Sequence, residues 1–210
     1  MALYSTNQLE DDYVMLHEDK ELKASSMDVN TREKRDVDGL LCFKKGITSD
    51  PRGYLSNWIV ENKENVCSWE GIWCRKHTRR VVVIYLPSLH LEGTLSPYLG
   101  NLSLLKYLDL SHNSFTGTIP PDFAQLKALR YLFLGFNNLS GSIPVEVVSN
   151  LNKLKYLYLS GNMLTSSIPE AFANMSNLRM LSLFDNHLIG TIQKSIGKLK
   201  SLKFFLLESK

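Results

Sequence analysis

The sequence predicts an α/β solenoid in which short parallel strands stack into one sheet behind a small helical N-terminal cap. Two observations support this fold class: leucine is unevenly distributed, and one motif recurs about every 24 residues. Of the 35 leucines among 210 residues, 28 lie from Leu86 onward. A chain of this length, with 44% hydrophobic residues, can bury a sizeable core. The clustering of leucine therefore indicates a repeated core.

The repeated motif is LxxLxLxxNxLxGxIP, where x is any residue. Its close matches begin at Leu105, Leu129, Leu154 and Leu178. A divergent copy begins at Val81, and a further copy begins at Leu202 and stops at Lys210. The distances between successive starts are 24, 24, 25, 24 and 24 residues. Such a constant period is the signature of a solenoid, so we expect residues 81–210 to form five complete repeats and a truncated sixth.

Each LxxLxL segment is expected to be a strand, because residues two apart in a strand point to the same side. The leucines then enter the core, and each copy needs neighbours on both sides to bury them. The motif asparagines are expected to form an architectural ladder, since a buried amide must donate to and accept from nearby backbone groups. They are Asn113, Asn137, Asn162 and Asn186.

The outward-facing strand positions form the candidate ligand-binding surface, because they line one concave face of the sheet. Aromatic residues dominate these positions, and aromatic residues are enriched in protein interfaces. The alternative interpretation is that tyrosine simply suits an exposed parallel strand. The candidates are Tyr85, Tyr107, Asp109, Tyr131, Phe133, Phe136, Tyr156, Tyr158, Phe184 and Asp185. We expect this face to bind an extended peptide or a protein surface.

The N-terminal part of the chain differs from the repeats. Residues 1–35 carry eight acidic and five basic residues without a sustained apolar period, which predicts a disordered charged leader. A short helix is expected to begin at Asp36 as its N-cap and to end at Gly46. The residues from Asp50 to Gly53 are expected to form a turn.

A family resemblance rests on these motifs. The string from Leu139 to Pro144, LSGSIP, resembles the plant-specific class of leucine-rich repeats. The segment 36–80, with Trp58, Cys67, Trp69 and Cys74, is similar to the N-terminal cap of plant leucine-rich-repeat receptor-like kinases. Within that group, the chain looks most like the pattern-recognition receptors that detect bacterial peptides. The resemblance covers residues 36–210 and implies a right-handed leucine-rich-repeat superhelix, a peptide or protein ligand, and a co-receptor as a further partner.

The three cysteines have different expected roles. The resemblance implies a cap disulfide between Cys67 and Cys74, whereas the alternative is a metal site that also uses His77. Only three candidate ligands are present for such a site, and structural zinc usually has four. Cys42 is left unpaired and is expected to pack as a small hydrophobic residue.

Catalytic and nucleic-acid functions receive no support from the sequence. Phosphate-binding loops, kinase motifs, zinc-protease motifs and nucleophile elbows are all missing from the sequence. The net charge of +3 comes from dispersed basic residues, which does not favour nucleic-acid binding. We therefore expect no catalytic or metal site, no cofactor and no small-molecule substrate.

Localisation signals in the sequence conflict. Glycosylation sequons begin at Asn101, Asn138 and Asn174 and, with the cysteine pair, favour a secreted context. Asn138 is expected to be the least accessible, because it follows a buried ladder residue. The first 35 residues are too charged for a secretory signal, and no apolar run reaches the roughly 18–20 residues that span a bilayer. An extracellular or plasma-membrane location is thus expected only if the full gene supplies those segments.

Three functional hypotheses remain open. The first is the ligand-sensing outer part of a membrane receptor in signalling or defence, with a transmembrane helix and a kinase encoded downstream. The second is a soluble inhibitor of cell-wall hydrolases of the same repeat class. The third is a truncated gene product. The apolar last residues, from Phe204 to Leu207, lack the polar cap that a terminal repeat needs, so we expect a cut array that self-associates.

Overall fold

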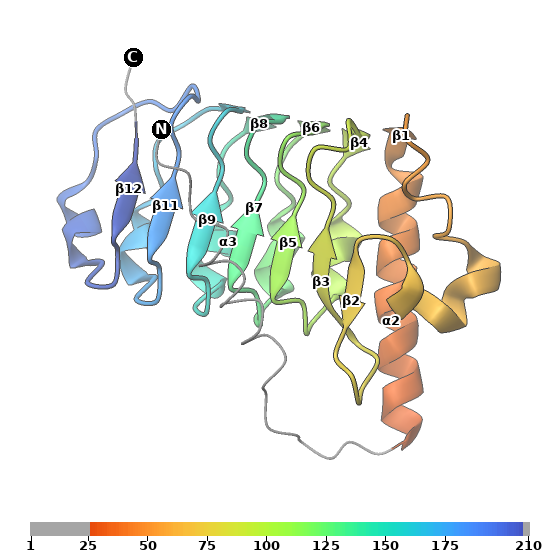
Figure 1. Ribbon diagram of the computed structural model, residues 1–210. Coiled ribbons are helices and arrows are strands. Elements are labelled where there is room, and N and C mark those ends of the chain that lie inside the picture. Colours follow the sequence, from red (N-terminus) through yellow and green to blue (C-terminus); the bar gives the residue numbers. More distant parts are fainter. Residues whose placement is uncertain (1–25, 208–210) are drawn as a thin grey trace.

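The computed structural model describes residues 26–207, which form a curved solenoid (Figure 1). Each coil contributes one strand to a seven-stranded sheet of order β12-β11-β9-β7-β5-β3-β2. Its strands are β2 (Ile72–Cys74), β3 (Val81–Tyr85), β5 (Tyr107–Asp109), β7 (Tyr131–Phe133), β9 (Tyr156–Tyr158), β11 (Met180–Ser182) and β12 (Phe204–Leu206). All neighbours are parallel except β2 and β3, which are antiparallel.

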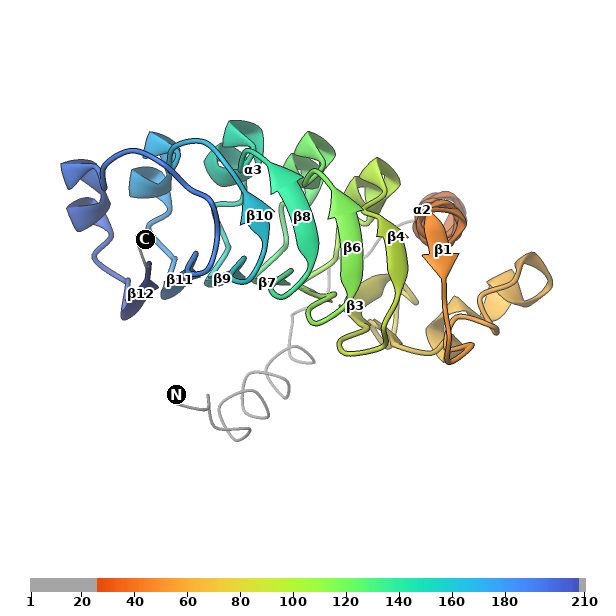
Figure 2. The ribbon, with the colours of Figure 1, turned by 90° about the horizontal axis from the view of Figure 1, so that it is seen from above.

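The other two sides of each coil are a short second sheet and a row of helices. The second sheet contains β1 (Ile47–Ser49), β4 (Glu92–Thr94), β6 (Ser114–Gly117), β8 (Asn138–Gly141) and β10 (Met163–Leu164). The helical row contains η2 (Pro97–Asn101), η3 (Pro121–Gln125), α3 (Val145–Asn150), η4 (Glu170–Asn174) and η5 (Lys194–Lys198). Figure 2 shows this row on the outer side of the curve and the seven-stranded sheet on its inner side. The predicted concave parallel sheet is confirmed.

The motif leucines form the core between these three sides. Leu108, Leu132, Leu157 and Leu181 lie in register on neighbouring strands, and each is at most 2% exposed. Burying a leucine side chain contributes about 1.5–3 kcal/mol. Because each leucine contacts its counterparts in the coils before and after it, the stabilisation depends on the stack as a whole.

The four ladder asparagines join consecutive coils through their side-chain amides. The Asn137 Nδ2 atom donates to the carbonyl oxygens of Leu110 and Leu134, and its Oδ1 atom accepts from the Phe115 amide. Asn113, Asn162 and Asn186 repeat this pattern in their own coils. Each amide thus satisfies backbone groups that the bend after the strand leaves unpaired.

The N-terminal helix is longer than expected. Helix α2 (Ser26–Lys45) includes residues that the sequence assigns to a disordered leader, so this part of the leader prediction is wrong. Asp36 lies inside the helix and does not cap it. The Asp36 side chain is 1% exposed and pairs with Arg80, a partner that only the folded chain brings near. The remaining leader, residues 1–25, lies outside the described residues.

The rest of the cap closes the N-terminal end of the core. After α2, strand β1 pairs antiparallel with β4, and the expected turn at 50–53 is present because the Gly53 amide donates to the Asp50 carbonyl oxygen. The rings of Trp58 and Trp69 stack with their centroids 5.5 Å apart. Both tryptophans are at most 2% exposed, so the cap covers the first coil with a continuous apolar surface.

Strand β12 lies at the other end of the seven-stranded sheet from the cap. Strand β12 pairs only with β11 within the described residues. Phe204 and Leu206 are 49% and 43% exposed, and Phe205 and Leu207 are half-buried. No helix of residues 26–207 is long and apolar enough to cross a membrane.

Candidate ligand-binding face

The outward-facing side chains of the seven-stranded sheet form four columns that run across the repeats. The first column contains Val83, Tyr107, Tyr131, Tyr156, Met180 and Phe204, and the second contains Tyr85, Asp109, Phe133, Tyr158, Ser182 and Leu206. The third contains Pro87, Ser111, Gly135, Ser160 and Phe184, and the fourth contains Ser88, His112, Phe136, Gly161 and Asp185. All ten predicted binding residues lie in these columns.

The tyrosines of the first column are less exposed than expected. Tyr131 and Tyr156 are only 3% and 6% exposed. Their rings stack with centroids 5.1 Å apart and planes 9° apart, and the Tyr107 ring lies 5.4 Å from that of Tyr131. Parallel strands are about 4.8 Å apart, close enough for ring-on-ring stacking. These tyrosines therefore form a second, smaller core on the sheet, and the prediction of a solvent-facing tyrosine column is wrong for Tyr131 and Tyr156.

A second aromatic group remains partly accessible. We call Phe133, Phe136, Tyr158 and Phe184 the aromatic platform; all four side chains are half-buried. Tyr158 lies at its centre, with its ring centroid 6.4 Å from Phe133, 6.0 Å from Phe136 and 6.4 Å from Phe184. Most of these ring pairs meet edge to face, a favourable arrangement that leaves ring surfaces available at the protein surface.

Two glycines make room for the platform. A Cβ atom at Gly135 would overlap the ring of Tyr158, and one at Gly161 would lie 2.5 Å from the Phe136 ring. The Phe136 backbone has a φ of 53°, a left-handed conformation that is costly for a bulky residue. The platform thus depends on two glycines that leave room for its rings and on a left-handed backbone position that recurs at His112, Gly161 and Asp185.

The two predicted aspartates have different environments. Asp109 is 7% exposed and accepts hydrogen bonds from the amide and the hydroxyl of Ser111, at 2.9 and 2.6 Å. Burial raises the pKa of Asp109, and the bonds from Ser111 partly oppose this. Its prediction as an accessible ligand contact is therefore wrong, because its oxygens already have partners within the fold. Asp185 is exposed three residues after the end of β11.

Sequence reasoning missed Trp73 as part of the aromatic surface. Trp73 lies on β2, which pairs antiparallel with β3, and its ring meets Tyr85 edge to face at 6.1 Å. Tyr85 itself is 43% exposed. The sequence held a signal for it, because the alternation of sides along a strand places Trp73 on the opposite side from Ile72 and Cys74. The repeat period does not extend to β2, so it did not include Trp73.

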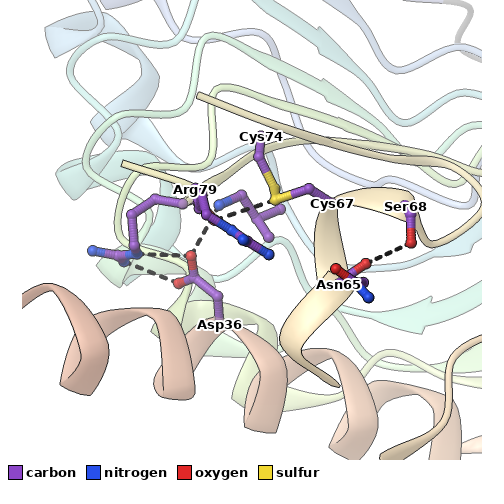
Figure 3. Close-up of a disulfide and its surroundings, with 8 residues drawn as sticks. Asp36, Asn65, Cys67, Ser68, Cys74 and Arg79 are labelled. Atoms are coloured by element: carbon purple, nitrogen blue, oxygen red, sulfur yellow. Dashed lines mark hydrogen bonds and ion pairs between the residues drawn. A yellow bond between two sulfur atoms is a disulfide. The ribbon is translucent and has the colours of Figure 1, made fainter. Parts of the chain in front are cut away.

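The cysteines of the cap form the expected disulfide. Cys67 and Cys74 are bonded, with Cα atoms 5.5 Å apart. Figure 3 shows the bond joining the end of η1 (Val60–Ser68) to β2, with Asp36 of α2 pointing toward the same region. The metal alternative is wrong, because the sulfurs are bonded to each other, and no cluster of three metal-ligating side chains occurs in residues 26–207. Cys42 is a half-buried free thiol on α2.

The three sequon asparagines are accessible. Asn101 and Asn174 end helices η2 and η4, and Asn138 begins β8. All three side chains are exposed. Asn138 is exposed although it follows the buried Asn137, because β8 turns its side chain away from the core.

This repeating coil, with its asparagine ladder and cysteine-linked cap, defines a leucine-rich-repeat protein. The family described as Leucine rich repeat N-terminal domain matches residues 33–75. The family described as Leucine rich repeat matches residues 80–139 and 140–188, more than half of the chain. The chain belongs to the leucine-rich-repeat family.

This chain matches only a small part of the length of its curated relatives. "Probable inactive leucine-rich repeat receptor kinase XIAO" from Oryza sativa subsp. japonica is 41% identical over 81 residues, which cover 39% of this chain and 7% of that protein. "Receptor kinase-like protein Xa21" from the same organism is 41% identical over 78 residues, which cover 35% of this chain and 8% of that protein. This chain therefore spans less than a tenth of these relatives.

Solved structures match more of the chain. The leucine-rich-repeat ectodomain of the receptor kinase SOBIR1 from Arabidopsis thaliana has a TM-score of 0.69 and 30% identity, and the match covers 89% of this chain and 94% of that one. The ectodomain of GASSHO1/SCHENGEN3 from Arabidopsis thaliana, in complex with CASPARIAN STRIP INTEGRITY FACTOR 2, has a TM-score of 0.76 and 33% identity. That match covers 84% of this chain and 21% of the other.

Proposed function

We propose that this chain is the ligand-sensing ectodomain part of a plant receptor-like kinase or receptor-like protein that acts in signalling or defence. It binds a peptide or protein ligand on the outward face of the seven-stranded sheet. The observation that carries this proposal is the half-exposed aromatic platform on a rigid stack of parallel strands. Recognition then belongs to this chain and catalysis to another part of the protein, in an extracellular or plasma-membrane setting.

The physical case for binding rests on preorganisation. The platform rings are held by ring contacts with their neighbours, and the coils beneath them are joined by the asparagine ladder. A surface whose side chains are already ordered loses little conformational entropy when a ligand binds. Tyrosine, as at the central Tyr158, is enriched among the residues that dominate the binding energy of protein interfaces.

The relatives support the receptor hypothesis over the hydrolase inhibitor. The relatives described above carry receptor-kinase names. A further neighbour with 30% identity and a TM-score of 0.62 is the Arabidopsis receptor kinase HAESA, solved in complex with the peptide hormone IDA and the co-receptor SERK1. By analogy we propose a co-receptor as the second partner of this chain. Recognition of bacterial peptides in particular stays a prediction.

The cap chemistry fits an extracellular setting. Disulfides persist in oxidising compartments, and Cys67 is bonded to Cys74. The three sequon asparagines lie on β8 and on the helical row, so glycans there would leave the seven-stranded sheet free. The bound ligand and the glycans would occupy different sides of the coil.

A peptide-display selection tests the proposed function. Random peptides are first selected for binding to the purified chain. Their affinities are then measured for the wild type and for a Phe133→Ala/Tyr158→Ala variant. The control variant carries Glu170→Ala and Lys194→Ala in the exposed helical row. Circular dichroism verifies that each variant is folded. We expect the platform variant to weaken binding by about tenfold or more, with no change in the control. Selected peptides that bind the platform variant as tightly as the wild type would contradict the proposal.

A further inference from the structure

We propose that the aromatic platform, together with Asp185, binds a positively charged side chain, arginine or lysine, of the ligand. The inference rests on the proposed function and specifies the ligand chemistry at one end of that face. Its basis is the juxtaposition of accessible ring surfaces with an exposed carboxylate across three consecutive repeats.

The first observation is the position of Asp185 relative to the rings. Asp185 directly follows Phe184 of the platform. The Gly161 amide donates to the Phe184 carbonyl oxygen at 3.1 Å, and the Asn162 amide donates to that of Asp185 at 3.1 Å. One coil earlier, the Phe136 amide donates to the Ser160 carbonyl oxygen at 2.7 Å in the same way. Phe136, Gly161 and Asp185 therefore occupy the same position in adjacent coils.

The second observation is that Gly161 leaves a gap in this column, and Phe136 extends over it. The Phe136 ring lies where a side chain at position 161 would be, and its centroid is 6.3 Å from that of Phe184. On its other side, Phe136 stacks on His112 at 4.5 Å with planes 19° apart. The ring is thus held between His112 and Phe184, on the side toward Asp185.

The third observation is the backbone conformation of Phe136. Phe136 adopts a φ of 53°, a left-handed conformation that is unfavourable for a bulky residue. The same position has positive φ in the neighbouring coils, at His112, Gly161 and Asp185, so the repeat sets this backbone conformation. The Phe136 ring belongs to neither buried hydrophobic cluster of the described residues. The left-handed turn therefore places the half-buried Phe136 ring on the surface of the sheet, outside the core.

Charge supplies the ligand chemistry. The face of an aromatic ring carries a negative electrostatic potential and attracts ammonium and guanidinium groups. Asp185 is exposed, and among residues 26–207 its carboxylate has no ion-pair partner. Lys155, Arg179 and Lys203 directly precede β9, β11 and β12, at the opposite end of the strands from Asp185. The basic side chains at the same end as Asp185 are the imidazoles of His112 and His187. The strand-end side of the platform is therefore suited to a cation.

A matched pair of synthetic peptides tests this inference. The probes are acetyl-Gly-Gly-Arg-Gly-Gly-amide and its citrulline counterpart, which has nearly the same shape but no charge. Each is titrated into isotopically labelled chain while the aromatic and amide NMR signals are followed. We expect the arginine peptide to shift the signals of Phe136, Tyr158 and Phe184, with an affinity about fivefold or more above that of the citrulline peptide.

Variants separate the cation site from a general peptide surface. Asp185→Asn should reduce the affinity for the arginine peptide about threefold or more, while Asp122→Asn, an exposed aspartate on η3, should not change it. Phe136→Gly suits the left-handed backbone and removes the ring, so it should abolish the charge preference while the chain stays folded. The inference is overturned if the arginine peptide does not shift the NMR signals of the platform residues, or if the citrulline peptide binds there with equal affinity. If both synthetic peptides bind the platform equally, only the cation inference is wrong and the proposed function is unaffected. If peptides from the display selection bind the Phe133→Ala/Tyr158→Ala variant as tightly as the wild type, the proposed function itself is contradicted.

Discussion

The carboxylate of Asp36 on α2 and the guanidinium of Arg80, 44 residues later, form a buried bidentate ion pair. The Arg80 Nε and Nη2 atoms donate to the two Asp36 oxygens at 2.8 and 2.9 Å. The Val81 amide donates to the same carboxylate at 3.0 Å, and Arg80 also donates to the Ser103 hydroxyl at 3.1 Å. The side chains are 1% and 5% exposed. This contact joins the cap helix to the start of the first repeat strand.

Removing the arginine should strongly destabilise the chain. In Arg80→Met, the Asp36 carboxylate would stay buried without its counter-charge, so we expect a loss of about 3–5 kcal/mol in the free energy of unfolding, measured by urea denaturation at neutral pH. The control is Arg35→Met, because Arg35 is exposed on the same helix. Equal stability of the two variants would show that the pair does not anchor the cap.

The same variant should gain stability as the pH falls. Burial raises the pKa of Asp36, while Arg80 and the Val81 amide lower it, so the Arg80→Met change should raise this pKa further. The folded state then binds a proton that the unfolded state has released, and stability decreases as pH rises from the unfolded pKa to the folded one. Urea midpoints measured from mildly acidic to neutral pH should therefore decrease more steeply in Arg80→Met than in the wild type.

Breaking the asparagine ladder should destabilise the chain without changing its surface. Asn162→Ala removes the partner of the Leu134 and Leu159 carbonyl oxygens and of the Leu139 amide. Each buried group left unsatisfied costs about 1–3 kcal/mol, so we expect a loss of about 3 kcal/mol or more by urea denaturation. Asn152→Ala, at an exposed site, should change stability by less than about 0.5 kcal/mol. A small effect at Asn162 would mean that water replaces the amide.

Filling the space under Tyr158 should displace the platform. In Gly135→Ala, the new methyl group overlaps the Tyr158 ring, so the ring must move, at a cost of about 1–3 kcal/mol. The near-ultraviolet circular dichroism of the tyrosines should change, and selected peptides should bind more weakly. The control is Gly197→Ala, where a Cβ atom would meet nothing within 4 Å. Unchanged spectra and affinity in Gly135→Ala would contradict this account.

The exposed apolar side chains of β12 should drive self-association of the isolated chain. Phe204 and Leu206 expose apolar side chains on β12, and exposed apolar surface favours association with another chain. Sedimentation velocity should show the sedimentation coefficient of the isolated chain rising with concentration. A Phe204→Lys/Leu206→Lys variant should remain monomeric over the same range. A monomeric wild type at high concentration would refute the prediction.

The repeats were predictable because their signal is local and periodic. Leu108, Leu132 and Leu157 recur at a nearly constant spacing, and a strand places every second residue on the same side whatever its surroundings. The period also places Asn137 and Asn162 at the bend after each strand. The Cys67–Cys74 disulfide followed from the resemblance of the cap and is present in the structure.

The candidate site was only partly predictable, because exposure depends on neighbours. The period shows that Tyr131, Asp109 and Phe136 face outward, but their accessibility is set by the side chains that surround them in the folded chain. Tyr131 is covered by Tyr156, and Asp109 is bonded to Ser111. Phe136 stays accessible because Gly161 gives its ring a place on the surface.

By itself, the sequence determined the solenoid, its leucine core, its asparagine ladder and the direction in which each strand residue points. These features repeat along the chain and follow from backbone geometry alone. The tertiary structure alone decided that Asp36 pairs with Arg80, that Tyr131 and Tyr156 are buried, and that the aromatic platform and Asp185 lie together at the strand ends. Those contacts join residues from different coils, so they exist only after the coils have stacked.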